Sequence, residues 1–161
     1  MILHASRSGQ RVNRYTGAAW TQLDEFDSTR GYASRGAAGL FWNWTAGPHR
    51  FSRHANKAWV PRYNRYLLPW GYNARYHSSE YAAIEIAQAN LGDHVSEDTL
   101  WTVAWIIKNE FLPLYPGLTI GTIQLPEHWE LPAGRADGKT DMWYNQPGVL
   151  AERVRNLMRE L

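Results

Sequence analysis

The chain has 161 residues, of which 17 are Lys or Arg and 15 are Asp or Glu, so its formal net charge is +2. This length fits one domain with a substantial core, and we expect a single domain spanning residues 1–161. The absence of cysteine excludes a disulfide framework and a thiolate metal site, and the small net charge argues against a dedicated DNA-binding domain.

The N-terminal part of the chain predicts two strands and a helix. Met1-Ile2-Leu3 is apolar and predicts a short buried strand that delivers His4 at its C-terminal end. Large apolar residues recur every three positions over Ala18–Phe26, which predicts a short helix. Gly39–Trp44 is typical of a strand, and Ala46-Gly47-Pro48 predicts the turn that closes it.

A third strand is predicted at Tyr81–Ala87, where Glu85 lies between Ile84 and Ile86. Side chains alternate along a strand, so Glu85 is expected on the face opposite to both isoleucines. A carboxylate between two large apolar residues lowers the stability of the fold unless it is paired, exposed or functional. Glu85 is therefore a candidate functional residue.

The clearest helix runs from about Ser96 to Phe111. Ser96 suits the N-cap, and acidic residues occupy the first turn, where they favour the helix dipole. Thr119–Gln124 is expected to form another strand, and a last helix is expected to start near Pro147. Strands alternating with helices predict an α/β fold, with a central mixed β-sheet flanked by α-helices in a single domain.

Candidate metal ligands lie at the two ends of the chain. His128-Trp129-Glu130-Leu131-Pro132 is followed by Gly138-Lys139-Thr140-Asp141, and His4 follows the first predicted strand. Two imidazoles and one carboxylate are what a catalytic zinc needs, with the fourth position left for water. Because there is no cysteine, any zinc must be held by His and carboxylate side chains.

The candidate ligands and the strand that carries Glu85 occur in a characteristic order along the chain. An early strand ends in His4, a middle strand carries Ile84-Glu85, and His128 is followed by Lys139-Thr140-Asp141. In this order, over nearly its whole length, the chain resembles the zinc-dependent N-acetylmuramoyl-L-alanine amidases of the phage-lysozyme and peptidoglycan-recognition type (amidase type 2). Members of that family cut the amide bond between N-acetylmuramic acid and the L-alanine of the peptidoglycan stem peptide.

The resemblance implies a role for each of five residues. His4, His128 and Asp141 would bind Zn2+, which lowers the pKa of a water in the remaining position toward neutrality. Glu85 would take the proton from that water and pass it to the leaving amine. Lys139 would stabilise the oxyanion of the tetrahedral intermediate.

The chain also departs from the family pattern. Met142-Trp143 stands where the family usually has Pro-Gly, and Pro69–Asn73 lacks the His of a Trp-His-Ala-Gly element. Gly39–Trp42 lacks the Tyr or His that many members carry there, and Ala133–Gly138 has the character of a small insertion. These departures concern substrate contacts more than the metal site.

The remaining histidines are expected to have structural roles. His49 and His54 are five residues apart, which is no standard ligand spacing and would place them on opposite faces of a strand. His77 and His94 are expected in a loop and a turn. Ala58–Tyr76, rich in Arg, Tyr, Trp and Asn, is expected to be a long surface loop: either a groove wall for sugars or a surface for single-stranded nucleic acid. The small net charge favours the groove.

We therefore expect a monomeric zinc amidase whose substrate is peptidoglycan, with no nucleic-acid partner. No membrane span and no signal peptide are expected from the sequence, so the protein would be made in the cytoplasm of a phage-infected host and act on the wall after release, as a phage endolysin. The alternative is a non-catalytic peptidoglycan-recognition module, ranked second because such members typically lose a zinc ligand. A nucleic-acid-binding domain is a third, more distant alternative, for which binding would depend steeply on salt.

Overall fold

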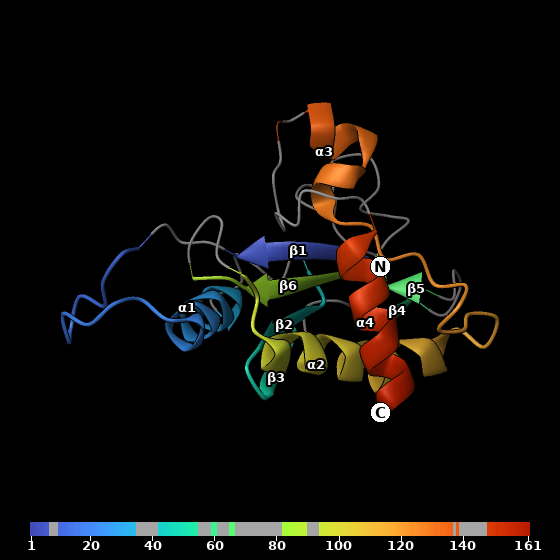
Figure 1. The fold of residues 1–161 in the computed structure, drawn as a ribbon, viewed down its shortest axis with the longest axis horizontal. Coiled ribbons are helices and arrows are strands. Elements are labelled where there is room, and N and C mark those ends of the chain that lie inside the picture. Colours follow the sequence, from blue (N-terminus) through green and yellow to red (C-terminus); the bar gives the residue numbers. More distant parts are fainter. Residues whose placement is uncertain are drawn as a thin grey trace.

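Four strands form a mixed sheet in the order β1-β6-β2-β3 (Figure 1). Their bounds are Ile2–Ser6 for β1, Trp44–Gly47 for β2, Arg50–Arg53 for β3 and Ala83–Ala87 for β6. Strands β1 and β2 both run parallel to β6, and β3 is antiparallel to β2. The computed structural model describes residues 1–6, 10–34, 42–54, 59–60, 65–66, 82–89, 94–136, 138 and 148–161.

The two faces of this sheet differ in chemistry because side chains alternate along each strand. One face is apolar and consists of Leu3, Ala5, Trp44, Ala46, Phe51, Ile84 and Ile86. The pairing register aligns one residue of each strand in a row on the other face: His4, Glu85, Thr45 and Ser52. The prediction that Glu85 lies opposite to Ile84 and Ile86 is confirmed.

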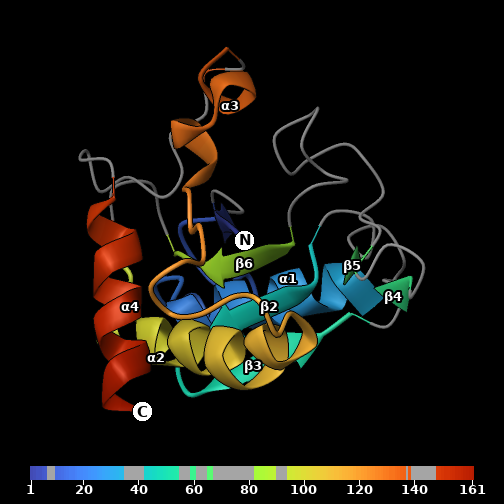
Figure 2. The same ribbon diagram turned by 90° about the vertical axis from the view of Figure 1, so that its right-hand side faces the viewer.

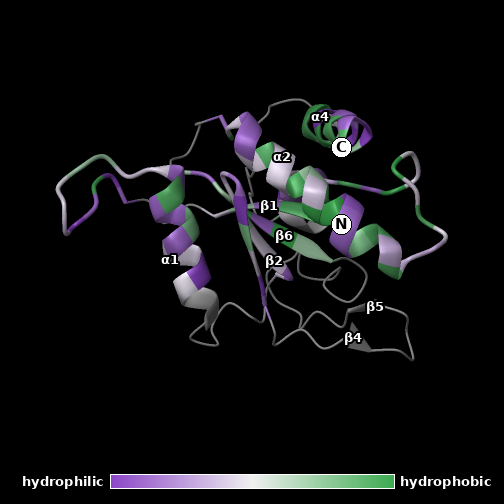
Figure 3. Ribbon diagram, turned by 90° about the horizontal axis from the view of Figure 1, so that it is seen from below, coloured by the Kyte–Doolittle hydropathy of each residue, from purple (hydrophilic) through white to green (hydrophobic). Residues whose placement is uncertain are grey.

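Helices α2 (Glu97–Ile106) and α4 (Val149–Glu160) cover the apolar face of the sheet (Figures 2 and 3). The predicted Ser96 cap is confirmed, since its side chain accepts a hydrogen bond from the backbone N–H of Thr99. The α-helix continues as a π-helical turn over Ile107–Phe111 and ends in a 3-10 turn over Leu112–Leu114. The apolar residues along one side of this helical segment are buried in the core: Leu100, Val103, Ala104, Ile107 and Phe111.

Helix α1 (Gln22–Ser34) packs on the polar face of the sheet, beside the C-terminal ends of its parallel strands. The Ser6 hydroxyl donates a 2.6 Å hydrogen bond to Oε1 of the buried Glu25, and the indole of Trp20 donates to Oε2 at 2.8 Å. Phe26 lies directly against Gly47, where a Cβ would come within 2.8 Å of its ring. These contacts attach α1 to the C-terminal ends of β1 and β2.

An ion pair ties the last strand of the sheet to the helical layer. The guanidinium of Arg53 on β3 donates two hydrogen bonds to the carboxylate of Glu110 in the π-helical turn. These hydrogen bonds hold the pKa of Glu110 below its ordinary value. The pair therefore fixes β3 against the end of the long helix.

The fold class predicted from the sequence is confirmed, since a mixed sheet is flanked by helices. Two element boundaries in the N-terminal part were wrong. Helix α1 begins after Thr21, because Thr21 and Asp24 exchange hydrogen bonds that cap it there. The strand expected to end at Trp44 continues to Gly47, because pairing with β6 is available there, whereas residues 39–41 of the expected range lie outside the described residues.

Three further expectations need correction. His4 lies in the middle of β1, and not at its end, because pairing with β6 extends the strand to Ser6. Thr119–Gln124 is a turn and not a strand, since the hydroxyls of its threonines bond to nearby backbone N–H groups. The expected loop at Ala58–Tyr76 contains two short paired strands, β4 (Trp59–Val60) and β5 (Arg65–Tyr66).

The last predicted helix is confirmed as α4. Leu150, Val154, Leu157 and Met158 of α4 are buried in the core, whereas Leu161 is exposed. Among the helices of the described ranges, none has the length and apolar character needed to cross a membrane.

Candidate functional site

His4 and Glu85 face each other across the β1–β6 pairing. The parallel register sets the two residues side by side, and Nδ1 of His4 lies 3.3 Å from Oε2 of Glu85. The residues are 8% and 6% exposed. The sheet itself thus holds an imidazole and a carboxylate together at a site with little water.

His128 reaches the same place from a distant part of the sequence. The segment before it runs along the free edge of β1, where the backbone N–H of Leu3 donates to the carbonyl of Pro126 at 2.9 Å and Leu3 forms a parallel bridge with Glu127. The 3-10 turn η4 (His128–Glu130) then places the ring of His128 with its centroid 4.2 Å from that of His4. His128 is 1% exposed.

A capping box fixes the turn that carries His128. The backbone N–H of Glu127 donates to Oε2 of Glu130 at 2.7 Å, and the fully buried Glu127 carboxylate accepts a 2.6 Å hydrogen bond from the indole of Trp129. Oε1 of Glu130 accepts from the backbone N–H of Gly148 at 2.8 Å, directly before α4. The position of His128 is therefore tied to the last helix as well as to β1.

The short helix α3 (Pro132–Ala136) lies against the backbone of His128. This segment covers most of the small insertion expected at Ala133–Gly138. A Cβ on Gly134 would lie 1.9 Å from the carbonyl oxygen of His128 and 2.9 Å from its carbonyl carbon. Only glycine allows this approach, so Gly134 is part of what positions His128.

Replacing Gly134 with alanine has two opposing effects on the free energy of unfolding. Helix propensity alone predicts stabilisation by about 1 kcal/mol, whereas the clash with a backbone carbonyl predicts a loss of about 1–3 kcal/mol. We expect the clash to dominate, so that the urea midpoint of the metal-free protein falls. Gly31→Ala in α1 is the matched control, since nothing lies within 4 Å of its Cβ position, and its midpoint should rise. A rise in both variants would show that Gly134 does not restrain His128.

Thr45, Trp42 and His54 extend the site along the polar face of the sheet. Thr45 pairs with Glu85 in the register, and its hydroxyl oxygen lies 2.7 Å from Nε2 of His54. The indole N–H of Trp42 lies 2.9 Å from that hydroxyl oxygen and 3.1 Å from the same Nε2. An indole N–H only donates, so the Thr45 hydroxyl oxygen and Nε2 of His54 are the two acceptors within its reach.

Sequence reasoning gave His54 only a structural role. The expected separation of His49 and His54 onto opposite faces is nevertheless seen, since His49 contacts Asp98 on α2, across the sheet from Thr45. The signal for His54 was its even spacing from Ser52, which pairs with Thr45. That signal becomes informative only when the β2–β3 register is known.

The structure brings together three of the five predicted site residues, namely His4, Glu85 and His128. Lys139 and Asp141 lie outside the described residues, as do Asn73, His77, the Pro69–Asn73 stretch and Met142-Trp143. Of the other histidines, His94 is exposed on the segment before α2.

The donor chemistry of this site suits zinc in part. Two neighbouring imidazoles with a carboxylate beside them are ligand types that zinc accepts. Within the described ranges, however, no group of three or more His, Asp or Glu side chains is arranged to hold a metal ion. A zinc ion bound by His4 and His128 would therefore need a further ligand from outside the described ranges, where Asp141 lies.

Comparisons of this chain with protein-family models, with curated proteins and with solved structures gave no match.

Proposed function

We propose that the protein is a zinc-dependent amidase that hydrolyses the bond between N-acetylmuramic acid and the L-alanine of the peptidoglycan stem peptide. The observation that supports this most is the meeting of His4, Glu85 and His128 on one face of the sheet. Two different strands and a distant turn contribute these residues, in the roles that the family resemblance assigns. A phage endolysin is the setting that we propose for this activity.

His4 and His128 would hold the zinc ion with Asp141. When bound, zinc would supply Lewis-acid activation of water and of the substrate carbonyl. Metal-binding imidazoles usually donate their second ring N–H to a carboxylate, which orients the ring. Glu85, 3.3 Å from Nδ1 of His4, is placed for that function.

Glu85 would also be the general acid–base. Its carboxylate would accept a proton from the attacking water and deliver it to the departing L-alanine amine as the carbon–nitrogen bond breaks. The ammonium of Lys139 would stabilise negative charge on the carbonyl oxygen. The low exposure of Glu85 and His128 limits competing water around these steps.

Mass spectrometry of purified peptidoglycan, digested with and without a zinc chelator, tests this proposal. Chelator-sensitive release of intact stem peptides with a free L-alanine amine is the expected result. Binding to the wall without new termini would favour the recognition module instead. New reducing sugar ends would indicate a glycosidase and contradict the assigned roles.

Replacing Lys139 with alanine tests the charge-stabilising role. We expect turnover to fall by about 10²–10³-fold, the loss typical of one oxyanion donor, while one zinc per chain is retained. Lys108→Ala is the control, because it removes the same charge at another position. The Lys108 ammonium donates to the Met158 carbonyl in the helical layer. Unchanged turnover in the Lys139 variant would reject this role.

A further inference from the structure

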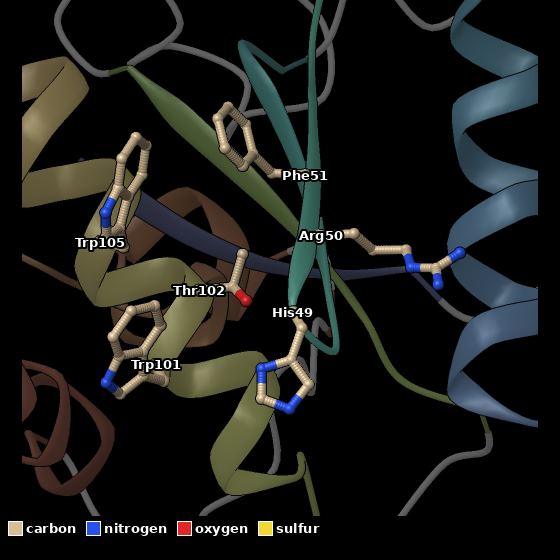
Figure 4. A pocket seen from close by; sticks show the side chains of 6 residues that line it. All are labelled: His49, Arg50, Phe51, Trp101, Thr102 and Trp105. Atoms are coloured by element: carbon tan, nitrogen blue, oxygen red, sulfur yellow. The ribbon is translucent and has the colours of Figure 1, made fainter.

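A small aromatic cavity lies between β3 and α2, on the side of the sheet opposite to His4 and Glu85 (Figure 4). Its volume is about 190 Å³, and it is lined by His49, Arg50, Phe51, Trp101, Thr102 and Trp105. Pockets for drug-sized ligands usually measure about 300–1,000 Å³. This cavity therefore suits a group of the size of one ring.

Two tryptophans on successive turns of α2 form one wall of the cavity. Trp101 is 43% exposed, although tryptophan is on average a highly buried residue. Trp105 is half-buried and packs on Phe51, with ring centroids 5.3 Å apart. Figure 4 shows both indoles beside the cavity. A flat aromatic surface is thus presented to solvent.

His49 lies at the rim of the cavity and has a strained backbone conformation. It is the second residue of the tight turn between Gly47 and Arg50, and its φ of 52° lies in the left-handed region. Glycine is the usual residue there, because other residues are strained at positive φ. The imidazole, in turn, lies 3.2 Å from the carboxylate of Asp98. The side chain that this turn position carries thus reaches Asp98 and lines the cavity.

The cavity offers both aromatic faces and polar edges. His49 and Asp98 together provide a hydrogen-bond donor and an acceptor at the rim. The guanidinium of Arg50 points away, toward α1, and lies 6.0 Å from the ring centre of Phe26 (Figure 4). The cavity therefore lacks the forked cation that would favour a phosphate or a carboxylate.

We propose that this cavity binds one neutral sugar ring of a peptidoglycan glycan strand. The C–H groups on the face of a pyranose carry slight positive charge and pack on the negative face of an indole, while its hydroxyls meet His49 and Asp98. The identity of the glycan rests on the proposed function. Since the cavity and the cleavage site lie on opposite faces of the sheet, the cavity would hold the insoluble wall while a neighbouring strand is cut.

Titration with the tetramer of N-acetylglucosamine tests this site directly. That sugar has no stem peptide and cannot be hydrolysed by an amidase, so tryptophan fluorescence and saturation-transfer NMR report binding alone. We expect saturable binding that Trp101→Ala weakens by about tenfold, the loss typical of one stacked aromatic residue. His128→Ala should leave it unchanged, which assigns the binding to this cavity and not to the cleavage site.

His49→Gly separates a sugar contact from a structural role. Glycine relieves the turn, so the melting temperature should stay the same or rise, while affinity for the sugar tetramer falls several-fold. Tyr15→Ala is the control for an exposed aromatic residue away from the cavity. Absence of saturable binding, or equal binding by wild type and Trp101→Ala, would overturn the proposed sugar site.

The proposed sugar site and the proposed amidase activity can be rejected independently of each other. With insoluble sacculi we expect Trp101→Ala to release stem peptides about tenfold more slowly than wild type at low enzyme concentration, and with a soluble muropeptide at an equal rate. Sugar binding that depends on Trp101 without any amide cleavage would retain the cavity and reject the amidase. Amide cleavage without sugar binding would do the reverse.

Discussion

Replacement of His128 by alanine is expected to abolish zinc binding and peptidoglycan hydrolysis together. His128 is 1% exposed and its ring lies 4.2 Å from that of His4, so it is one of the two imidazoles that would hold the ion. A catalytic zinc uses three protein ligands, and losing one imidazole of the His4 and His128 pair leaves too few to retain it. Zinc content of the purified protein and turnover on sacculi are the two measurements.

The variant also removes a buried side chain, so folding must be separated from metal binding. Thermal melting of metal-free wild type and metal-free His128→Ala gives the cost of the cavity alone. His94→Ala is the matched control, because His94 is exposed and has no assigned role in the site. It should keep one zinc per chain and normal turnover. One equivalent of zinc in folded His128→Ala would remove His128 from the ligand set.

Local chemistry made part of this fold predictable. The Ser96 cap, the acidic first turn and the apolar stripe of α2 all act within one helix, so the sequence contains everything that determines them. The same holds for Glu85, since alternation between Ile84 and Ile86 decides its face without reference to other strands. The predictions that these elements exist and which of their faces is buried were therefore correct.

The features that spacing in the sequence could not predict depend on contacts between residues that are far apart in the sequence. His54 faces the site only because the turn between Gly47 and Arg50 sets the β2–β3 register. The approach of His128 to His4 was expected only from the family resemblance, since it depends on an edge contact between Leu3 and Pro126 that no spacing in the sequence encodes. The role of Gly134 likewise follows from a single close contact with the His128 carbonyl.

Glu85→Gln is the second variant with a large expected effect. Glutamine keeps the size of the side chain and its place between two buried isoleucines, but it cannot accept a proton from water. General acid–base catalysis contributes about 10²–10⁴-fold, and we expect turnover to fall within this range. Zinc should remain bound, because Glu85 is assigned no ligand role. Near-normal turnover would exclude Glu85 from proton transfer.

The same variant distinguishes the two functions that we propose for Glu85. If its main role is to orient His4, zinc affinity should weaken by about 10–100-fold, and saturating zinc should restore turnover. If it transfers protons, turnover stays low at every zinc concentration. Glu25→Gln is the matched control: Glu25 is a second buried carboxylate on the same face, bonded by Ser6 and Trp20. Its loss should lower the urea midpoint and leave turnover per folded molecule intact, because Glu25 binds α1 to β1 and does not contact the histidines through any of these bonds.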